Sequence, residues 1–284
     1  VCCLTNPFLG HEAEPLEKAE EPKKVMVIGG GVAGLSAAFI AKERGHEVTL
    51  YEAGDVLGGN MRLAAYPPGK GDITNMIRSY IHRCQKDGVK IVMNCEVTPE
   101  LIKEEKPDSV IIATGSKTLI LPIEGIDNPA IIHGSDLLDG KRAAGKKVLV
   151  VGGGMVGCET AAFLGEQEHD VTVIEFRDTV GADVIHEHRV YLMKDFEDYG
   201  IKEITGAKVC KFYEDGVEYE TADGVRHESR GYDSVILSMG FRNYNPLEEK
   251  IKDLVPETHV IGDAIRARRA LDATKEAYEV ASRI

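Results

Sequence analysis

The chain lacks the sequence features of several protein classes. None of its six cysteines forms a C-x-x-C or C-x4-C pair with another, so we expect no dithiol/disulfide redox centre within the chain. Because the cysteines are scattered in a chain too large to need disulfide bonds, we expect a reducing, cytoplasmic location. No apolar run approaches the roughly 18 residues of a membrane helix. The formal net charge of -13 argues against a nucleic acid or an anionic membrane as a partner.

What the chain does contain is an internal repeat. Residues 25–52, VMVIGGGVAGLSAAFIAKERGHEVTLYE, align without a gap with residues 148–175, VLVVGGGMVGCETAAFLGEQEHDVTVIE. A second pair of similar segments follows, DSVIIATG at 108–115 and DSVILSMG at 233–240. One folding unit of about 120 residues is therefore used twice. A chain of 284 residues is long enough for two such domains.

Each repeat predicts a β-α-β unit. An apolar run such as Val25–Ile28 is typical of a strand that is buried on both faces of a parallel sheet. Three glycines then turn the chain into a helix, and in the first repeat Gly45 can supply a left-handed C-terminal cap. Glu168 stands at the matching position of the second repeat, so that helix is expected to end by a less favoured device. Both halves are expected to be α/β and Rossmann-like.

The Gly-x-Gly-x-x-Gly spacing in each repeat predicts a dinucleotide site. It follows a strand, opens a helix and precedes an acid, Glu52 or Glu175, by about 20 residues. The first glycine permits a tight turn, the second lets a pyrophosphate approach the backbone, and the third lets the helix pack closely. The helix N-terminus attracts the phosphates, and the glutamate is placed to accept hydrogen bonds from adenosine ribose hydroxyls. Two such units predict two dinucleotides, a flavin and a nicotinamide nucleotide.

Further motifs resemble those of the two-dinucleotide flavoproteins, whose fold is that of glutathione reductase: LGGN at 57–60, ATG at 113–115, and Gly262-Asp263. The resemblance implies that the first fingerprint binds FAD and that the second binds NAD(P)H in an inserted domain. The implied FAD residues are Gly29, Gly31, Ala33, Gly34, Glu52, Gly58, Gly59, Asn60, Leu63, Ala113, Thr114, Gly115, Gly262 and Asp263. The implied NAD residues are Gly152, Gly154, Met155, Val156, Gly157, Glu159, Glu175 and Gly240, with Glu159 beside the nicotinamide.

The implied layout has a discontinuous FAD domain, residues 23–140 plus 241–284, and an inserted NAD(H) domain, residues 141–240. No Ser/His/Asp or Cys/His arrangement stands out. Three histidines are expected to be structural or solvated: His133, His186 and His188. Because hydride transfer between two cofactors needs no protein nucleophile, no catalytic residue is expected.

The first residues carry a closer resemblance. The segments CLTNP at 3–7 and GGNMRLAAYPPGK at 58–70 resemble those of multidomain iron–sulfur flavoenzymes, which include 2,4-dienoyl-CoA reductase, 2-enoate reductase and trimethylamine dehydrogenase. In that family an N-terminal TIM barrel carries FMN, and four cysteines after it hold a [4Fe–4S] cluster. Cys3 matches the last of these cysteines, and Cys2 is then not a ligand. Residues 1–22 would be the remnant of this segment and a linker, with three further ligands and the barrel upstream.

The resemblance implies an electron-input module: NADH reduces FAD, and in the intact enzyme electrons pass through the cluster and FMN to an activated C=C bond, such as a 2-enoate or an enoyl-CoA. Glu175 favours NADH, because a 2′-phosphate would meet its charge, although the nearby Arg177 could accommodate NADPH. Two alternatives stay open. One is a free-standing NADH-dependent flavoprotein reductase with a protein acceptor, against which the CLTNP match counts. The other is a non-redox ADP-binding module as in trimethylamine dehydrogenase, against which LGGN, ATG and Gly262-Asp263 count.

Overall fold

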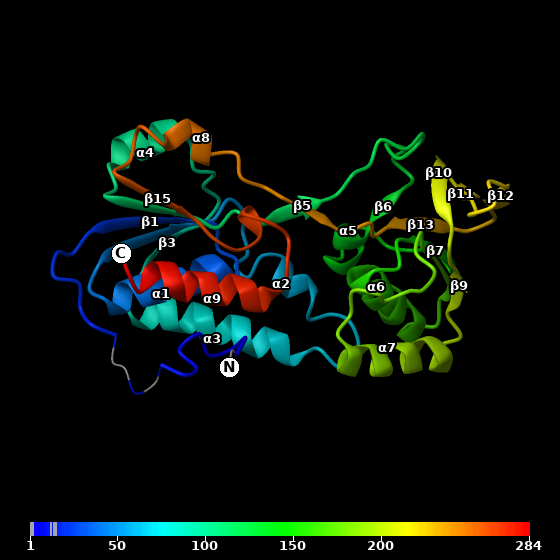
Figure 1. Cartoon of the computed structure of the whole chain (residues 1–284), viewed down its shortest axis with the longest axis horizontal. Coiled ribbons are helices and arrows are strands. Elements are labelled where there is room, and N and C mark those ends of the chain that lie inside the picture. Colours follow the sequence, from blue (N-terminus) through cyan, green and yellow to red (C-terminus); the bar gives the residue numbers. More distant parts are fainter. Residues whose placement is uncertain (1–2, 12, 14–15) are drawn as a thin grey trace. The chain divides into compact units, whose positions relative to one another are not determined.

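The computed structural model describes residues 3–11, 13 and 16–284. They form two compact units, each built around a five-stranded sheet (Figure 1). The first unit contains the chain up to Ala65 with residues 72–117 and 242–284, and the second contains residues 66–71 and 118–241. The predicted α/β, Rossmann-like fold class is confirmed. Across the described residues, no helix combines the length and the apolar character that a bilayer crossing requires.

The sheet of the first unit has the strand order β15-β4-β1-β2-β3, and all neighbouring strands are parallel. Its strands are β1 (Lys24–Ile28), β2 (Glu47–Tyr51), β3 (Lys90–Val92), β4 (Ser109–Ile112) and β15 (Glu257–Val260). The helices are α1 (Val32–Glu43), α2 (Asn60–Leu63), α3 (Asp72–Lys86), α4 (Pro99–Glu105), α8 (Glu248–Ile251) and α9 (Ala270–Ala281), with the short 3₁₀ helix η1 (Gly262–Ala264). Helices α1, α3 and α9 cover one face of the sheet, and α4 and α8 cover the other (Figure 1).

Both faces of this sheet are buried, as the continuous apolar strand predicts. Along β1, Val25 and Val27 belong to the core beneath α1, whereas Met26 and Ile28 belong to the core on the α4 side. Successive side chains of a strand point to opposite faces, so an uninterrupted apolar run fits a strand that is covered twice. The glycine turn after β1 therefore starts from a strand fixed by packing on both sides.

The second unit repeats this plan with the parallel strand order β6-β13-β7-β8-β9. Its strands are β6 (Ile132–His133), β7 (Lys147–Val151), β8 (Asp170–Ile174), β9 (Lys202–Ile204) and β13 (Ser234–Leu237). Its helices are α5 (Gly134–Leu138), α6 (Met155–Glu166) and α7 (His186–Asp198). An antiparallel sheet is formed by β10 (Lys208–Tyr213), β11 (Gly216–Glu220) and β12 (Arg226–Ser229). Val148 and Val150 of β7 pack with α6, whereas Leu149 and Val151 pack with the antiparallel sheet.

The connection between the two repeats lies in the second unit. Residues 118–140, which the sequence predicts to be part of the first domain, belong to the second compact unit. The physical reason is that β6 pairs in parallel with β13 and so belongs to the second sheet. The chain passes between the units four times, at 65/66, 71/72, 117/118 and 241/242. At the last two of these passages, β5 (Ser116–Thr118) pairs with β14 (Phe241–Asn243).

The helices that follow the two glycine turns end at residues of different type. Gly45 follows α1 with φ +100°, in the left-handed region that favours glycine. Glu168 has φ +62° at the matching position after α6. The less favoured device expected from the sequence is therefore a left-handed glutamate, a conformation that costs a residue with a Cβ roughly 1 kcal/mol.

Candidate functional site

The first glycine of each fingerprint makes a tight turn at the end of the central strand. Gly29 has φ +109° and Gly152 has φ +104°. A Cβ on Gly29 would lie 2.3 Å from the carbonyl oxygen of Ala113, and a Cβ on Gly152 would lie 2.4 Å from that of Ser238. Only glycine fits both the conformation and the contact. The segments 113–115 and 238–240 therefore lie directly against the two turns.

The third glycine of each fingerprint lets the helix approach the turn. A Cβ on Gly34 would lie 1.9 Å from the carbonyl oxygen of Gly29, and a Cβ on Gly157 would lie 1.8 Å from that of Gly152. These distances leave no room for any side chain, so the starts of α1 and α6 are held close to their strands. This is the packing role that the spacing predicts.

The second glycine of each fingerprint is the N-cap residue of its helix. Gly31 precedes α1 and Gly154 precedes α6, and neither helix has a side-chain cap on this residue. A Cβ on Gly31 would meet no atom within 4 Å, so the backbone there is open to a close ligand. A Cβ on Gly154 would lie 3.3 Å from a carboxylate oxygen of Asp183. The two positions predicted to approach a pyrophosphate are therefore alike in backbone and different in the side chain that lies over them.

The two predicted glutamates hold the glycine turns in the same way. Glu52 Oε2 accepts a hydrogen bond from the Gly30 N–H at 2.7 Å, and Glu175 Oε2 accepts one from the Gly153 N–H at 2.6 Å. The other oxygen of each glutamate accepts an N–H from two residues further along the chain. A carboxylate has about four acceptor positions, so each glutamate can still accept hydrogen bonds from ribose hydroxyls.

A second loop follows each glutamate and covers the glycine turn. The Gly58 N–H donates to the Gly30 carbonyl oxygen at 2.8 Å, and the Gly181 N–H donates to the Gly153 carbonyl oxygen at 2.7 Å. Gly58 and Gly59 both have positive φ, which explains the Gly-Gly pair there. The loop around Gly181 was not singled out from the sequence, although it continues the repeat without a gap.

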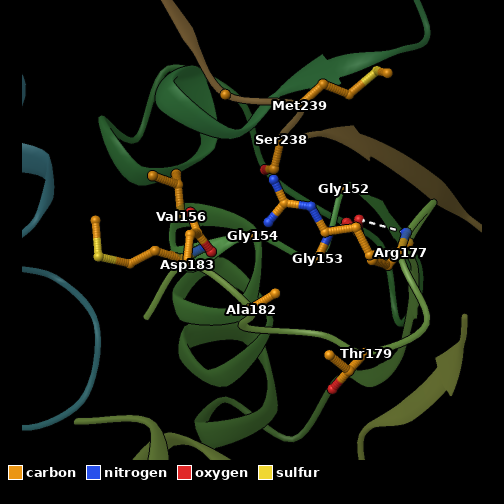
Figure 2. Close-up of a pocket in the computed structure, with 13 residues that line it drawn as sticks. Gly152, Gly153, Gly154, Val156, Arg177, Thr179, Ala182, Asp183, Ser238 and Met239 are labelled. Carbon is orange, nitrogen blue, oxygen red and sulfur yellow. Dashed lines mark hydrogen bonds between the residues drawn. The ribbon is translucent and has the colours of Figure 1, made fainter. Parts of the chain in front are cut away.

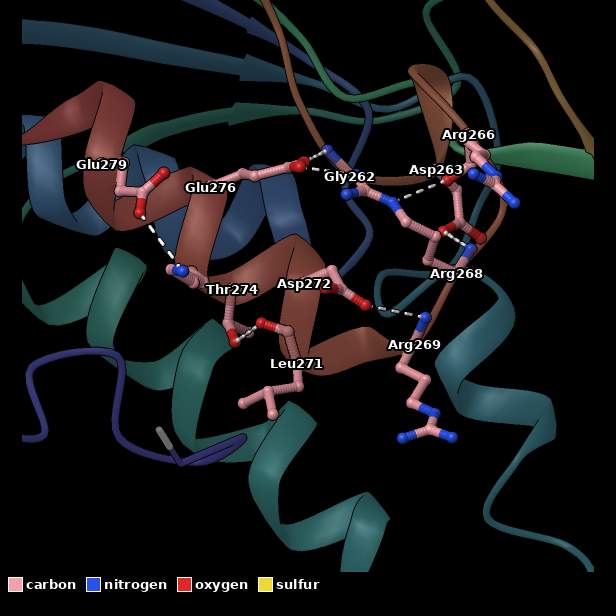
Figure 3. A network of polar contacts seen from close by, with 11 residues as sticks. Gly262, Asp263, Arg266, Arg268, Arg269, Leu271, Asp272, Thr274, Glu276 and Glu279 are labelled. Atoms are coloured by element: carbon pink, nitrogen blue, oxygen red, sulfur yellow. Dashed lines mark hydrogen bonds and ion pairs between the residues drawn. The ribbon is translucent and has the colours of Figure 1, made fainter. Parts of the chain in front are cut away.

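The C-terminal Gly-Asp segment joins the first site through a network of polar contacts. Ser116 Oγ donates to Asp263 Oδ2 at 2.9 Å, and Asn60 Nδ2 lies 3.3 Å from the same hydroxyl. In the neighbouring part of the network, Glu276 of α9 accepts the Gly262 N–H at 2.8 Å (Figure 3). The network thus brings together predicted residues that are far apart in the sequence. Ser116 and Glu276 were not predicted, because hydroxyl and carboxylate residues without a motif give no local signal.

The remaining residues predicted for FAD lie in α1, in α2 and after β4 of the first unit. Ala33 stands in the first turn of α1, and a Cβ on Gly262 would lie 3.1 Å from its Cβ. Thr114 and Gly115 follow directly after the contact between Ala113 and the glycine turn. Leu63 is the last residue of α2.

In the second unit, the predicted nicotinamide-nucleotide residues line a pocket of about 210 Å³ (Figure 2). Those in the lining are Gly152, Gly154, Met155, Val156, Glu175 and Gly240. Arg177 extends across the pocket toward Ser238 (Figure 2). Gly157 and Glu159 lie further along α6 and are not in the lining.

Glu159 is held by two partners within the second unit. It is 5% exposed, its Oε1 forms an ion pair with Lys70, and this oxygen lies 3.3 Å from His188 Nε2. The carboxylate is therefore fixed in position. The sequence did not predict either contact, because the partners lie 89 and 29 residues away along the chain.

The cysteines fall into two chemical classes. Cys3 Sγ lies 3.2 Å from Thr5 Oγ1, and this hydrogen bond lowers the pKa of the Cys3 thiol below its ordinary value. Burial raises the pKa of Cys84 and of Cys158 to about 12, so these two are unreactive core residues. In the described part of the chain, no group of three or more His, Cys, Asp or Glu side chains is placed to hold a metal. Cys2 lies outside the described residues.

One protein-family model, described as pyridine nucleotide-disulphide oxidoreductase, matches residues 23–261. Among curated proteins, cinnamate reductase from Clostridium sporogenes is 35% identical over 288 residues, which is 100% of this chain and 43% of that protein. NADH oxidase from Thermoanaerobacter brockii is 34% identical over 99% of this chain and 44% of that protein. The chain thus spans less than half the length of these relatives.

Solved structures of related proteins match the chain over most or all of its length. A 2-naphthoyl-CoA reductase has a TM-score of 0.93 and 33% identity, covering 100% of this chain and 43% of that chain. Thioredoxin reductase from T. acidophilum has a TM-score of 0.70 at 19% identity, covering 92% of this chain and 97% of that one. At this low identity the second likeness concerns the fold alone.

Proposed function

This chain belongs to the pyridine nucleotide-disulphide oxidoreductase family, and we propose that it is the electron-input module of an NADH-dependent flavin oxidoreductase. FAD would bind in the first unit, at the turn after β1, and NADH in the second unit, at the turn after β7. In terms of residues, we propose that the FAD site lies within 23–140 plus 241–284 and the NAD(H) site within 141–240, although residues 118–140 pack with the second unit.

One observation carries the proposal: the chain contains two copies of the same phosphate-binding turn. Each copy has a glycine that no other residue can replace, a helix that starts beside it, and a glutamate that holds the middle of the turn. Exposed N–H groups at a helix start, together with the helix dipole, bind phosphate. Two copies are what an enzyme needs if one dinucleotide is to reduce another.

The assignment of FAD to the first copy is supported by the network of Asn60, Ser116 and Asp263. This network adds polar groups beside the turn after β1, where a flavin would have its ribityl chain and pyrophosphate. The described residues around the second turn form instead the pocket in which Glu175 and Arg177 both lie. A carboxylate and a guanidinium are the groups that read an adenosine ribose and its 2′ position.

The chain's own residues would bind and orient the two nucleotides. When both are bound, the nicotinamide and the flavin supply the hydride-transfer chemistry. Glu52 and Glu175 would accept hydrogen bonds from the two adenosine riboses, and the backbone at Gly31 and Gly154 would approach the two pyrophosphates. Glu159, fixed by Lys70 and His188, is the residue that we expect nearest to the nicotinamide, beyond the lining of the pocket.

We also propose that this module serves a longer enzyme. Its relatives include proteins named cinnamate reductase and 2-naphthoyl-CoA reductase, of which it spans 43%. Electrons would pass from FAD through a [4Fe–4S] cluster, with Cys3 as one ligand, to FMN in an upstream TIM barrel. The final acceptor would be an activated C=C bond such as that of a 2-enoate or an enoyl-CoA.

The visible absorption spectrum of the purified chain tests the proposal most directly. We expect a bound flavin that heat releases as FAD and that NADH bleaches without oxygen. Release of ADP instead of FAD would favour the non-redox structural module. If the reduced flavin passes electrons to a soluble protein as fast as NADH reduces it, this would favour the alternative of a free-standing flavoprotein reductase. A chain that binds neither nucleotide would refute the two-site proposal.

A further inference from the structure

The repeat continues beyond Glu52 and Glu175, and the two copies differ in charge at the equivalent positions 60 and 183. Asn60 follows Gly58 by two residues, and Asp183 follows Gly181 by two residues. Because Gly58 and Gly181 donate matching hydrogen bonds to the two glycine turns, Asn60 and Asp183 occupy equivalent places in the two units. One is a neutral amide and the other carries a negative charge.

The two side chains make different contacts. Asn60 Nδ2 donates to the backbone and hydroxyl oxygens of Ser116, at 3.2 and 3.3 Å. Asp183 Oδ1 instead accepts the N–H of Met155 at 2.9 Å, and its Oδ2 lies 3.3 Å from the position of a Cβ on Gly154. Both oxygens of Asp183 thus lie over the residues that open α6.

The start of α6, where the Asp183 carboxylate lies, is also the place where a nucleotide phosphate would bind. The free N–H groups of a helix start are satisfied by any nearby anion, whether a side chain or a phosphate. Asp183 supplies such an anion from within the chain (Figure 2). A phosphate oxygen and the carboxylate cannot both accept the Met155 N–H along the same direction, and their like charges repel.

The loop that carries Asp183 is anchored on both sides, so the backbone position from which its side chain extends is fixed. Val180 is fully buried and Val184 is 8% exposed. Arg189 Nη2 donates to the Val180 carbonyl oxygen at 3.0 Å, and the Gly181 N–H is bound to the glycine turn. Asp183 itself is exposed, so its side chain can rotate away while the loop stays in place.

We propose that Asp183 is an internal competitor for the pyrophosphate of the nicotinamide nucleotide, and that it determines how tightly this nucleotide binds. This inference rests on the proposed function, because it takes the second site to be the nicotinamide site. A nicotinamide nucleotide has to leave after each turnover, whereas a flavin stays. A competing carboxylate weakens binding where exchange is needed, and the neutral Asn60 leaves the equivalent position of the first site without this competition.

The test is isothermal titration calorimetry of NAD⁺, ADP-ribose and adenosine with the flavin-loaded chain. D183N and D183A remove the charge, and D178N removes a neighbouring exposed charge on the same loop as a matched control. Losing a helix-capping side chain changes stability by about 0.5–2 kcal/mol, so we expect NAD⁺ and ADP-ribose to bind D183A roughly two- to thirtyfold more tightly. Adenosine, which has no pyrophosphate, should bind all four proteins equally.

Higher salt should reduce the difference between the wild type and D183N, because screening weakens the repulsion. Unchanged or weaker binding of ADP-ribose to both folded variants would overturn the inference and leave the proposed function intact. So would an equal gain for adenosine or for D178N, which would indicate a general change of the pocket. If neither the wild type nor any variant binds NAD⁺, the proposed function fails, and this inference fails with it.

Discussion

We expect the choice between NADH and NADPH to depend on Glu175, and replacing it with Gln tests the second site directly. Its carboxylate accepts N–H groups from Gly153 at 2.6 Å and from Arg177 at 2.9 Å. Each hydrogen bond from a ribose hydroxyl to this charged group would contribute about 1.5–3 kcal/mol. The loss of one such bond in E175Q therefore predicts roughly ten- to hundredfold weaker binding of NADH.

For NADPH, the carboxylate of Glu175 also opposes binding. A 2′-phosphate about 4 Å from the carboxylate would be repelled by about 4 kcal/mol per pair of unit charges at an effective dielectric constant of about 20. Arg177, which lies across the same pocket, offsets part of this repulsion. We therefore expect the wild type to prefer NADH over NADPH by at least about tenfold. E175Q should reduce this preference, and R177A should weaken the binding of NADPH more than the binding of NADH.

The assay is anaerobic stopped-flow reduction of the bound flavin by each nucleotide, over a range of concentrations. Glu52 has the matching pair of backbone hydrogen bonds in the first unit, so E52Q is the control and should leave the NADH/NADPH ratio unchanged. Thermal unfolding of each variant separates a loss of ribose binding from a loss of the glycine turn. Faster reduction of the wild type by NADPH, or an unchanged ratio in E175Q, would refute the reasoning.

Four further outcomes are expected. Glu52→Ala should loosen FAD and spare NAD⁺ while Glu175→Ala does the reverse, as flavin content and calorimetry would show; equal loss of one nucleotide in both would contradict two separate sites. Glu168→Gly should raise the free energy of unfolding by about 0.5–1 kcal/mol in urea titrations, because glycine adopts positive φ without strain, and Glu168→Ala should give no gain. Burial lowers the pKa of His46 in the folded chain, so between this lower pKa and about 6.5 the unfolded chain binds a proton that the folded chain does not. The free energy of unfolding should therefore fall as the pH drops through this range, and His46→Gln should make it less dependent on pH there. In the intact enzyme, Cys3→Ala should reduce the iron content, because a [4Fe–4S] cluster needs four ligands, and an unchanged iron content would exclude Cys3 as a ligand.

The parts of the fold that the sequence predicted are those with local causes. The run Val25–Ile28 is typical of a strand covered on both faces, and the structure confirms this prediction. The glycines at 29 and 34 are required by contacts with residues near them in space and by the turn itself. Such features are visible without a structure, because the backbone conformation and the residue type determine one another.

Contacts between residues that are distant in sequence could not be predicted in the same way. Ser116 reaches Asp263, and Lys70 reaches Glu159, across 147 and 89 residues. No periodicity connects such pairs, and the side chains are of ordinary types for a protein surface. Packing alone determines that they meet, which is why the sequence left Glu159 with a predicted place and no predicted partner.

Asp183 is predictable in part: the sequence gives its position but not its contact. Its position follows from the repeat, since the two segments stay aligned past the glutamates and Gly58 and Gly181 make matching hydrogen bonds. Its contact with Met155 does not follow from the repeat, because Asn60 at the equivalent position bonds to Ser116 instead. A duplicated sequence predicts the scaffold common to both copies. The functional difference between the copies then has to lie in positions where the scaffold is equal and the side chains are not. Asn60 and Asp183 are such a pair, and the Asp183 carboxylate lies over the start of α6, where we propose that the second nucleotide's phosphates bind.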